Sequence, residues 1–143
     1  MLQTSTVKES TLRLLKSLQS EPWLEKAIEE DGMRIASVAD IAAMKMHAII
    51  NSGKRPKDFV DIAFLSMRYS YNDIKRLLLR RYPAYDPIMV DKAVIYFGDI
   101  DELMVPEIKM IGFQFDFDHI KGRIMKMTDN PDKVYYRAPL KKS

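Results

Sequence analysis

The apolar positions of this chain recur mostly at the spacing of α-helices. From Val38 to Ile50 the residues are apolar on almost every side except for one lysine, which is typical of a buried helix at the centre of a fold. Ser37 is a good N-cap for this segment, and the Asn-Ser-Gly sequence after it is a stop signal. The pattern therefore predicts a central apolar helix at about 38–50.

Apolar periodicity and end signals predict further helices on both sides. Proline stands at the first position of segments 56–68 and 87–96, and serine precedes segment 70–81. A helix over 116–127 is favoured over a strand in 112–117. The other predictions are helices over 6–20 and 22–30, a turn at Asp31-Gly32, an extended segment over 33–36 and a short helix or turn over 100–104. Together they predict an all-α fold, a compact bundle of five to seven helices.

The length and composition fit one helical domain in a reducing compartment. With 143 residues we expect an N-terminal helix in 1–21, a helical domain in 22–127 and an extended or disordered basic tail in 128–143. There are no cysteines, which excludes disulfides and thiolate metal sites and fits the cytoplasm. No apolar run approaches the roughly 18 residues of a spanning helix, so we expect a cytoplasmic location and no membrane contact.

The net charge of +3 is mildly basic and does not by itself indicate a dedicated nucleic-acid binder. Basic residues gather in the tail from Lys121 onward and on the predicted helix over 70–81. A solvated helix face explains the second group, and a patch for a polyanion or an acidic partner is the alternative. The residues of this group are Lys75, Arg76, Arg80 and Arg81.

Lys45 is the lysine inside the central apolar helix. Such a lysine either extends along the helix edge to solvent or meets an anion. After a Gly-Lys-Arg-Pro turn, Asp58 and Asp61 stand near the start of the next helix, where the helix dipole alone would explain Asp58. Asp61 has apolar neighbours and needs a partner, which Lys57 or Lys45 could supply. We predict that Lys45 lies within salt-bridge or one-water distance of Asp58 or Asp61.

Other motifs that suggest phosphate or metal chemistry are incomplete. The sequence around Gly53 lacks the upstream glycine and the Ser/Thr of a phosphate-binding loop, which favours a basic turn. Two Asp-x-Asp sequences have the form used in two-metal phosphoryl transfer, but neither follows a Gly-Ser, so we interpret them as surface acids. No Cys/His/Asp cluster at ligand spacing surrounds either histidine, so structural histidines are expected. These residues are Asp99, Asp101, Asp116, Asp118, His47 and His119.

The ten methionines favour an adaptable core. The alternative is an apolar surface that packs on a missing lobe or promotes a homodimer.

A longer run of sequence carries a family resemblance. EEDGMRIASVADIAAMKMHAIINSGKRPKDFVDIAFL, followed by RYS, RRYP and KAVIYFGD, resembles the C-terminal helical half of the AbiEii-type nucleotidyltransferases. These are toxins of bacterial abortive-infection toxin–antitoxin systems, related to the polymerase β superfamily. The resemblance runs from about Trp23 to about Met125. Its most specific pieces are the lysine of AAMKMHA and the run KRPKDFVDI, which resemble the family's third and fourth motifs.

The resemblance implies which residues bind nucleotide. Through the two motifs it assigns nucleotide binding to Lys45, Lys57, Asp58 and Asp61. Two further basic residues of the turn, Lys54 and Arg55, are candidate phosphate contacts. For the intact family it implies magnesium, a nucleoside triphosphate and a cognate antitoxin.

The first motif of such enzymes, a Gly-Ser followed by Asp-x-Asp on a small sheet, is not found in this sequence. The chain contains no Gly-Ser dipeptide, and the stretch before Arg34 is too short for a sheet-based catalytic lobe. We therefore expect a helical lobe that is inactive alone, with no confident catalytic residue and no metal or cofactor of its own. Two alternatives remain, a stand-alone helical module that binds a protein or nucleic acid and a lobe completed in trans by a separate catalytic chain.

Overall fold

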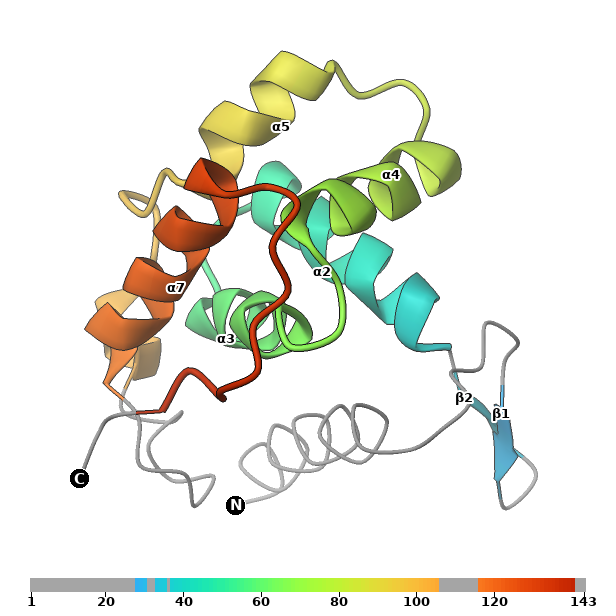
Figure 1. Cartoon of the computed structure of the whole chain (residues 1–143), viewed down its shortest axis with the longest axis horizontal. Coiled ribbons are helices and arrows are strands. Elements are labelled where there is room, and N and C mark those ends of the chain that lie inside the picture. The colour runs from blue at the N-terminus through green and yellow to red at the C-terminus, as the bar shows by residue number, and fades with distance from the viewer. Residues whose placement is uncertain (1–27, 31–32, 36, 106–115, 141–143) are drawn as a thin grey trace.

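The computed structural model describes residues 28–30, 33–35, 37–105 and 116–140 (Figure 1). The described elements are the strands β1 (Ile28–Glu30) and β2 (Met33–Ile35), the helices α2 (Val38–Asn51), α3 (Pro56–Leu65), α4 (Tyr71–Arg81) and α5 (Pro87–Val94), the 3-10 helix η1 (Glu102–Met104), and α7 (Phe117–Asp129). Helices dominate this part of the chain, and the predicted all-α class is confirmed. The two short strands form an antiparallel hairpin that precedes α2.

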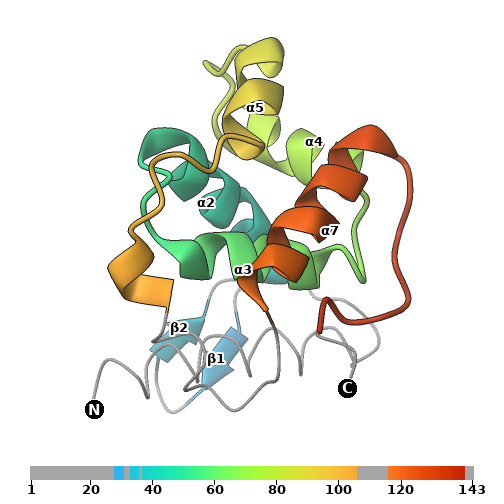
Figure 2. The same ribbon diagram turned by 90° about the vertical axis from the view of Figure 1, so that its left-hand side faces the viewer.

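Helices α2 and α3 occupy the centre of the described fold. Helix α2 packs against α3, α4 and α5, while α7 packs against α3 (Figures 1 and 2). The predicted apolar helix over 38–50 is confirmed, because Ala42 and Met46 are fully buried and Ile49 is nearly so. Helix α3 is buried at every position except Lys57, so it shares the centre with α2.

Side-chain caps begin most of the described helices. The Ser37 hydroxyl accepts a hydrogen bond from the Asp40 backbone N–H at 3.1 Å at the start of α2. Ser70 and Asp73 form a reciprocal capping box at the start of α4. The carboxylate of Asp86 accepts a bond from the Ile88 N–H at 2.9 Å and begins α5. These caps are the ones that the sequence predicts.

Three predicted helices end at different residues from those expected. The prediction of a helix over 22–30 is wrong for residues 28–30, because Ile28–Glu30 is a strand that pairs with Met33–Ile35. The helix predicted to reach 68 ends at Leu65, where the Ser66 hydroxyl donates to the Ala63 carbonyl and the backbone tightens into a turn. The helix predicted to reach 96 ends at Val94.

The remaining element predictions are either confirmed or lie outside the described residues. The extended segment predicted over 33–36 is confirmed for Met33–Ile35. The helices expected over 70–81 and 116–127 are confirmed as α4 and α7, and η1 lies within the segment 100–104. The helix over 6–20, the start of the helix at 22, the Asp31-Gly32 turn and residues 112–115 of the alternative strand lie outside the described part.

The described residues that follow α7, 130–140, contain no helix or strand but pack against the helices. The Tyr135 backbone N–H donates to the Ser66 carbonyl at 2.9 Å, and the Asn72 N–H donates to the Pro131 carbonyl at 2.9 Å. The Arg123 guanidinium lies 4.6 Å from the Tyr135 ring centroid and donates to the Ser66 hydroxyl at 2.8 Å. We call residues 130–140 the C-terminal strap. It ties the end of α3 and the start of α4 to α7.

Methionines are found both in the core and on the surface. Met46 and Met127 are fully buried, whereas Met44, Met89 and Met125 are exposed. The core therefore uses methionine, as expected, and a methionine surface that packs on another lobe or another copy stays a prediction. Among the helices of the described part, none combines the length and the apolar character needed to cross a bilayer.

Two glycines should respond in opposite ways to replacement by alanine. Gly122 lies inside α7, and a Cβ there would meet no atom within 4 Å. Gly122→Ala should raise the free energy of unfolding by about 0.5–1 kcal/mol, because alanine favours the helix and restricts the unfolded chain. Gly53 has a φ of 67°, and its Cβ would lie 3.2 Å from the Ile49 carbonyl oxygen. Gly53→Ala should therefore lower the same quantity by about 1 kcal/mol.

Urea unfolding followed by circular dichroism measures both changes. Shifts of the same sign in the two variants would contradict the assignment of these backbone conformations.

Candidate functional site

One lysine and two aspartates meet between α2 and α3. The Lys45 Nζ lies 2.9 Å from Asp61 Oδ2 and 3.3 Å from Asp58 Oδ1. The Lys45 side chain is 17% exposed, whereas those of Asp58 and Asp61 are 5% and 0% exposed. The predicted contact is thus confirmed for both aspartates, and Lys45 rather than Lys57 is the close partner of Asp61. We call Lys45, Asp58 and Asp61 the ion-pair cluster.

The local sequence explains how the cluster forms. Asp58 and Asp61 are three residues apart in α3, so they project from one helix face. Gly53, with its positive φ, reverses the chain after α2 and lets α3 return beside it. Lys45 stands in the second half of α2 and faces the first turns of α3. A short turn between two buried helices is therefore sufficient to bring the three groups together.

Burial and charge act in opposite directions on the groups of this cluster. Burial lowers the pKa of Lys45, but the charge of Asp61 and then that of Asp58 outweigh it, so the pKa lies above the usual 10.5. Burial raises the pKa of Asp61, and the charge of Lys45 opposes that rise. Because the pKa of Lys45 is raised on folding, its contribution to stability is present at neutral pH. It is lost only as the pH rises through that raised value.

Asp61 depends strongly on the lysine. Lys45 donates a hydrogen bond to Asp58 and lies 2.9 Å from Asp61 Oδ2, and no other described residue donates a hydrogen bond to either buried oxygen of Asp61. The Lys45 ammonium is therefore the main group that offsets the free-energy cost of removing the Asp61 carboxylate from water. A buried charge held by one counter-charge is expensive to leave alone, so removal of Lys45 should be costly.

Additional positive charge lies beside the cluster. Lys54 and Arg55 are exposed in the turn before α3, and Lys57 is half-buried in its first turn. Burial lowers the pKa of Lys57, and the positive charge of Lys45 lowers it further. Within the described residues Lys57 forms no ion pair. We call Lys54, Arg55 and Lys57 the basic turn. The exposed Asp99 and Asp101 lie beside it, since the Asp101 backbone N–H donates to the Lys54 carbonyl at 2.9 Å, so the positive charge is local to the side chains of the turn.

The Asp-x-Asp sequences lie at helix starts. The Asp101 carboxylate accepts a hydrogen bond from the Leu103 backbone N–H at 3.0 Å, at the start of η1. Asp116 accepts one from the Asp118 N–H at 2.9 Å, at the start of α7. Asp99, Asp101 and Asp118 are exposed, as expected for surface acids. Across the residues that the structure describes, no group of three or more His, Cys, Asp or Glu side chains is placed to hold a metal ion.

The sequence analysis missed a group of three rings. The His47 ring stacks on Tyr82 with centroids 4.2 Å apart and an angle of 8° between the planes. The Tyr85 hydroxyl forms a hydrogen bond with His47 Nδ1. We call His47, Tyr82 and Tyr85 the ring cluster. His47 therefore makes structural contacts, as expected, whereas His119 is exposed. The available signal was the Tyr-Pro-Ala-Tyr sequence directly after two arginines.

Comparison with known proteins places these observations in a family. Residues 15–133 match the family described as "Nucleotidyl transferase AbiEii toxin, Type IV TA system". The chain is also 32% identical over 80 residues to an uncharacterized protein of Aquifex aeolicus (strain VF5), in an alignment that covers 54% of this chain and 38% of that protein. The chain thus spans less than half the length of this relative. No solved structure matches the chain.

Replacing the cluster lysine should destabilise the fold in a pH-dependent way. Lys45→Met removes the counter-charge of two buried carboxylates and should lower the free energy of unfolding by about 3 kcal/mol at pH 7. Without the lysine, the carboxyls of the folded protein bind protons more readily than those of the unfolded chain. The difference in the free energy of unfolding between the parent and Lys45→Met should therefore become smaller as the pH falls from 7 toward about 4.

Urea unfolding across that pH range is the measurement. Lys75→Met is the control, since Lys75 pairs with the half-exposed Asp91. This substitution should lower the free energy of unfolding by less than about 1 kcal/mol. A Lys45→Met variant as stable as the parent would show that the buried pairing contributes nothing.

Proposed function

Since this chain belongs to the AbiEii nucleotidyl transferase toxin family, we propose that it forms the helical lobe of a nucleotidyltransferase and contributes to the nucleotide-binding site. One observation carries the proposal. The residues that resemble the family's third and fourth motifs, Lys45, Asp58 and Asp61, form one ion-pair cluster with the basic turn directly beside it. A cluster used only to hold two helices together has no need of cations beside it that form no ion pair with any described residue.

The contacts support different roles for the two lysines. Lys45 is already held by two carboxylates, so its main role is to fix the position of α3 and of the residues on its first turn. Lys57 is half-buried and forms no ion pair with any described residue, which leaves its ammonium available for a phosphate. Lys54 and Arg55 are exposed in the adjacent turn and extend the positive surface. Positive groups around a triphosphate favour nucleotidyl transfer by neutralising the charge on its phosphates.

The described residues do not provide a magnesium site. Both carboxylates of the cluster face Lys45, and the two Asp-x-Asp sequences lie at helix starts on the surface. We infer that the carboxylates that bind magnesium in the family's reaction come from another segment or another chain. Residues 1–143 by themselves are therefore expected to transfer no nucleotide.

Family membership also supports a biological setting. The family is described as a type IV toxin–antitoxin system. We propose that the chain acts in the bacterial cytoplasm, with a cognate antitoxin, in abortive infection.

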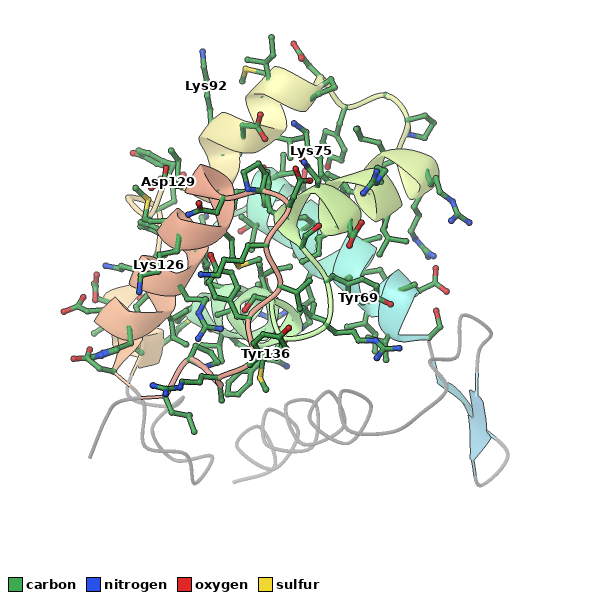
Figure 3. The ribbon with its side chains drawn as sticks, viewed as in Figure 1. Tyr69, Lys75, Lys92, Lys126, Asp129 and Tyr136 are labelled. Carbon is green, nitrogen blue, oxygen red and sulfur yellow. The ribbon has the colours of Figure 1, made fainter. Side chains whose placement is uncertain are left out.

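Nucleotide binding provides the first test. The purified chain should bind a nucleoside triphosphate more tightly than the monophosphate, because only the triphosphate can span the basic turn. Lys57→Gln should weaken triphosphate binding about tenfold, which corresponds to about 1.4 kcal/mol. Lys92→Gln is the matched control, since Lys92 is exposed on α5 and points away from the body of the fold (Figure 3).

The pH dependence of this binding sharpens the test. The pKa of Lys57 is lowered from the usual 10.5, so this lysine loses its charge at a lower pH than an ordinary lysine. The affinity of the parent chain for the triphosphate should therefore fall as the pH rises through the pKa of Lys57. The affinity of Lys57→Gln should not show this decrease. Calorimetric titration measures both effects. Equal affinities of the two variants would exclude Lys57 as a phosphate ligand.

Activity provides the second test. Incubation of the chain with magnesium, labelled nucleoside triphosphates and RNA or protein acceptors should give no transfer of label. Transfer that disappears in Lys45→Ala or Asp61→Ala would show that the chain is a complete enzyme.

A further inference from the structure

The ring cluster lies on a different side of α2 from the ion-pair cluster. His47 follows Lys45 by two residues, which corresponds to about 200° around the helix. The rings border a mostly apolar cavity of about 470 Å³. Its lining residues are His47, Arg81, Tyr82, Pro83, Ala84 and Tyr85. They come from the second half of α2 and from the segment that joins α4 to α5 (Figure 1). The proposed nucleotide site uses none of them.

A second cavity shares the lining residue Arg81 with the first. It has a volume of about 270 Å³ and lies between the start of α2 and the end of α4. Arg81 lines both cavities, and Arg80 lines the second. The consecutive residues Arg80 and Arg81 therefore border two neighbouring cavities, and the stacked rings line one of them.

Among the basic residues of α4, Arg80 and Arg81 line these cavities, whereas Lys75 and Arg76 do not. Lys75 pairs with Asp91 at 2.9 Å and lies between α4 and α5 (Figure 3). Arg76 pairs with Asp73 one turn before it on the same helix. Arg80 is exposed and forms no ion pair within the described part. The predicted basic patch is thus reduced to the end of α4 nearest the ring cluster.

The ion pair of Arg81 does not remove it from this surface. It lies 2.6 Å from an Asp40 oxygen, but the two side chains are 44% and 42% exposed. Surface pairs of this kind are weak, so a phosphate can compete for the guanidinium.

We propose that this surface binds single-stranded nucleic acid. A base enters the apolar cavity and stacks against the ring cluster, while Arg80 and Arg81 bind the phosphates on either side of it. Aromatic faces accept any base, and arginine matches the geometry of phosphate. An acidic peptide would satisfy the arginines, but it offers a flat group only where an aromatic side chain stands beside its acids, whereas every nucleotide carries one. The rings therefore favour nucleic acid.

Charge neutralisations on α4 test the phosphate contacts. A fluorescent single-stranded RNA of about 12 nucleotides should bind the chain in the micromolar range at moderate salt. Arg80→Gln should weaken binding about fivefold, because Arg80 lines the second cavity, next to the ring-lined one. Arg76→Gln removes the same charge from the same helix outside both cavities, and should change binding less than about twofold. Equal losses in the two variants would overturn the proposal, because only net charge would then matter.

Ring substitutions test the stacking. RNA that carries one 2-aminopurine should lose fluorescence when the base stacks in the cavity. Tyr82→Phe should keep this quenching, and Tyr82→Leu should abolish it. His47→Leu gives a second test at the other ring of the stack, so one unstable variant does not decide the result. Quenching that persists in both leucine variants would overturn the proposal. So would polyglutamate that displaces the RNA at equal charge, or a parent chain that binds no RNA.

Discussion

The described fold depends on one ammonium group shared by two buried carboxylates. Asp61 is completely removed from water and Asp58 nearly so, and only Lys45 brings a full opposite charge within 3.3 Å of them. Such pairs usually add little net stability over apolar residues, but a wrong arrangement of the helices would leave the charges unpaired at great cost. The cluster therefore fixes the position of α3 on α2. Since α7 packs on α3 while α4 and α5 pack on α2, the other helices take their places from this contact.

The parts that the sequence could predict are those governed by local signals. Helix α2 was predictable because its sequence is apolar on almost every side of the helix. Ser37 and Gly53 mark its two ends. The Lys45 contact was predictable because a short turn limits where α3 can lie. The pairing of Lys45 with an acidic residue was predictable because a buried charge without a partner is costly.

The parts that the sequence could not predict depend on residues far apart in the chain. A helix was predicted over 22–30, yet Ile28–Glu30 pairs with the strand Met33–Ile35. The ring cluster joins His47 to two tyrosines of the α4–α5 connection, and no periodicity predicts that meeting. The ion pairs of Lys75 with Asp91 and of Arg81 with Asp40 could not be predicted either, because these acids lie on other helices. Tertiary pairing, rather than propensity, decides each of these features.

The C-terminal strap has a consequence for the order in which the protein folds. The strap joins Asp132 to Asn72, and Arg123 of α7 beside it contacts Ser66; these contacts link residues 60 and 57 positions apart. Contacts of such separation form slowly because a long loop must first close. During synthesis α2, α3 and α4 emerge from the ribosome well before α7 and the strap, so the end of α3 must wait for its last partners. We therefore expect a nascent chain in which the ion-pair cluster is already formed while the face of α3 that α7 will cover is still open to chaperones.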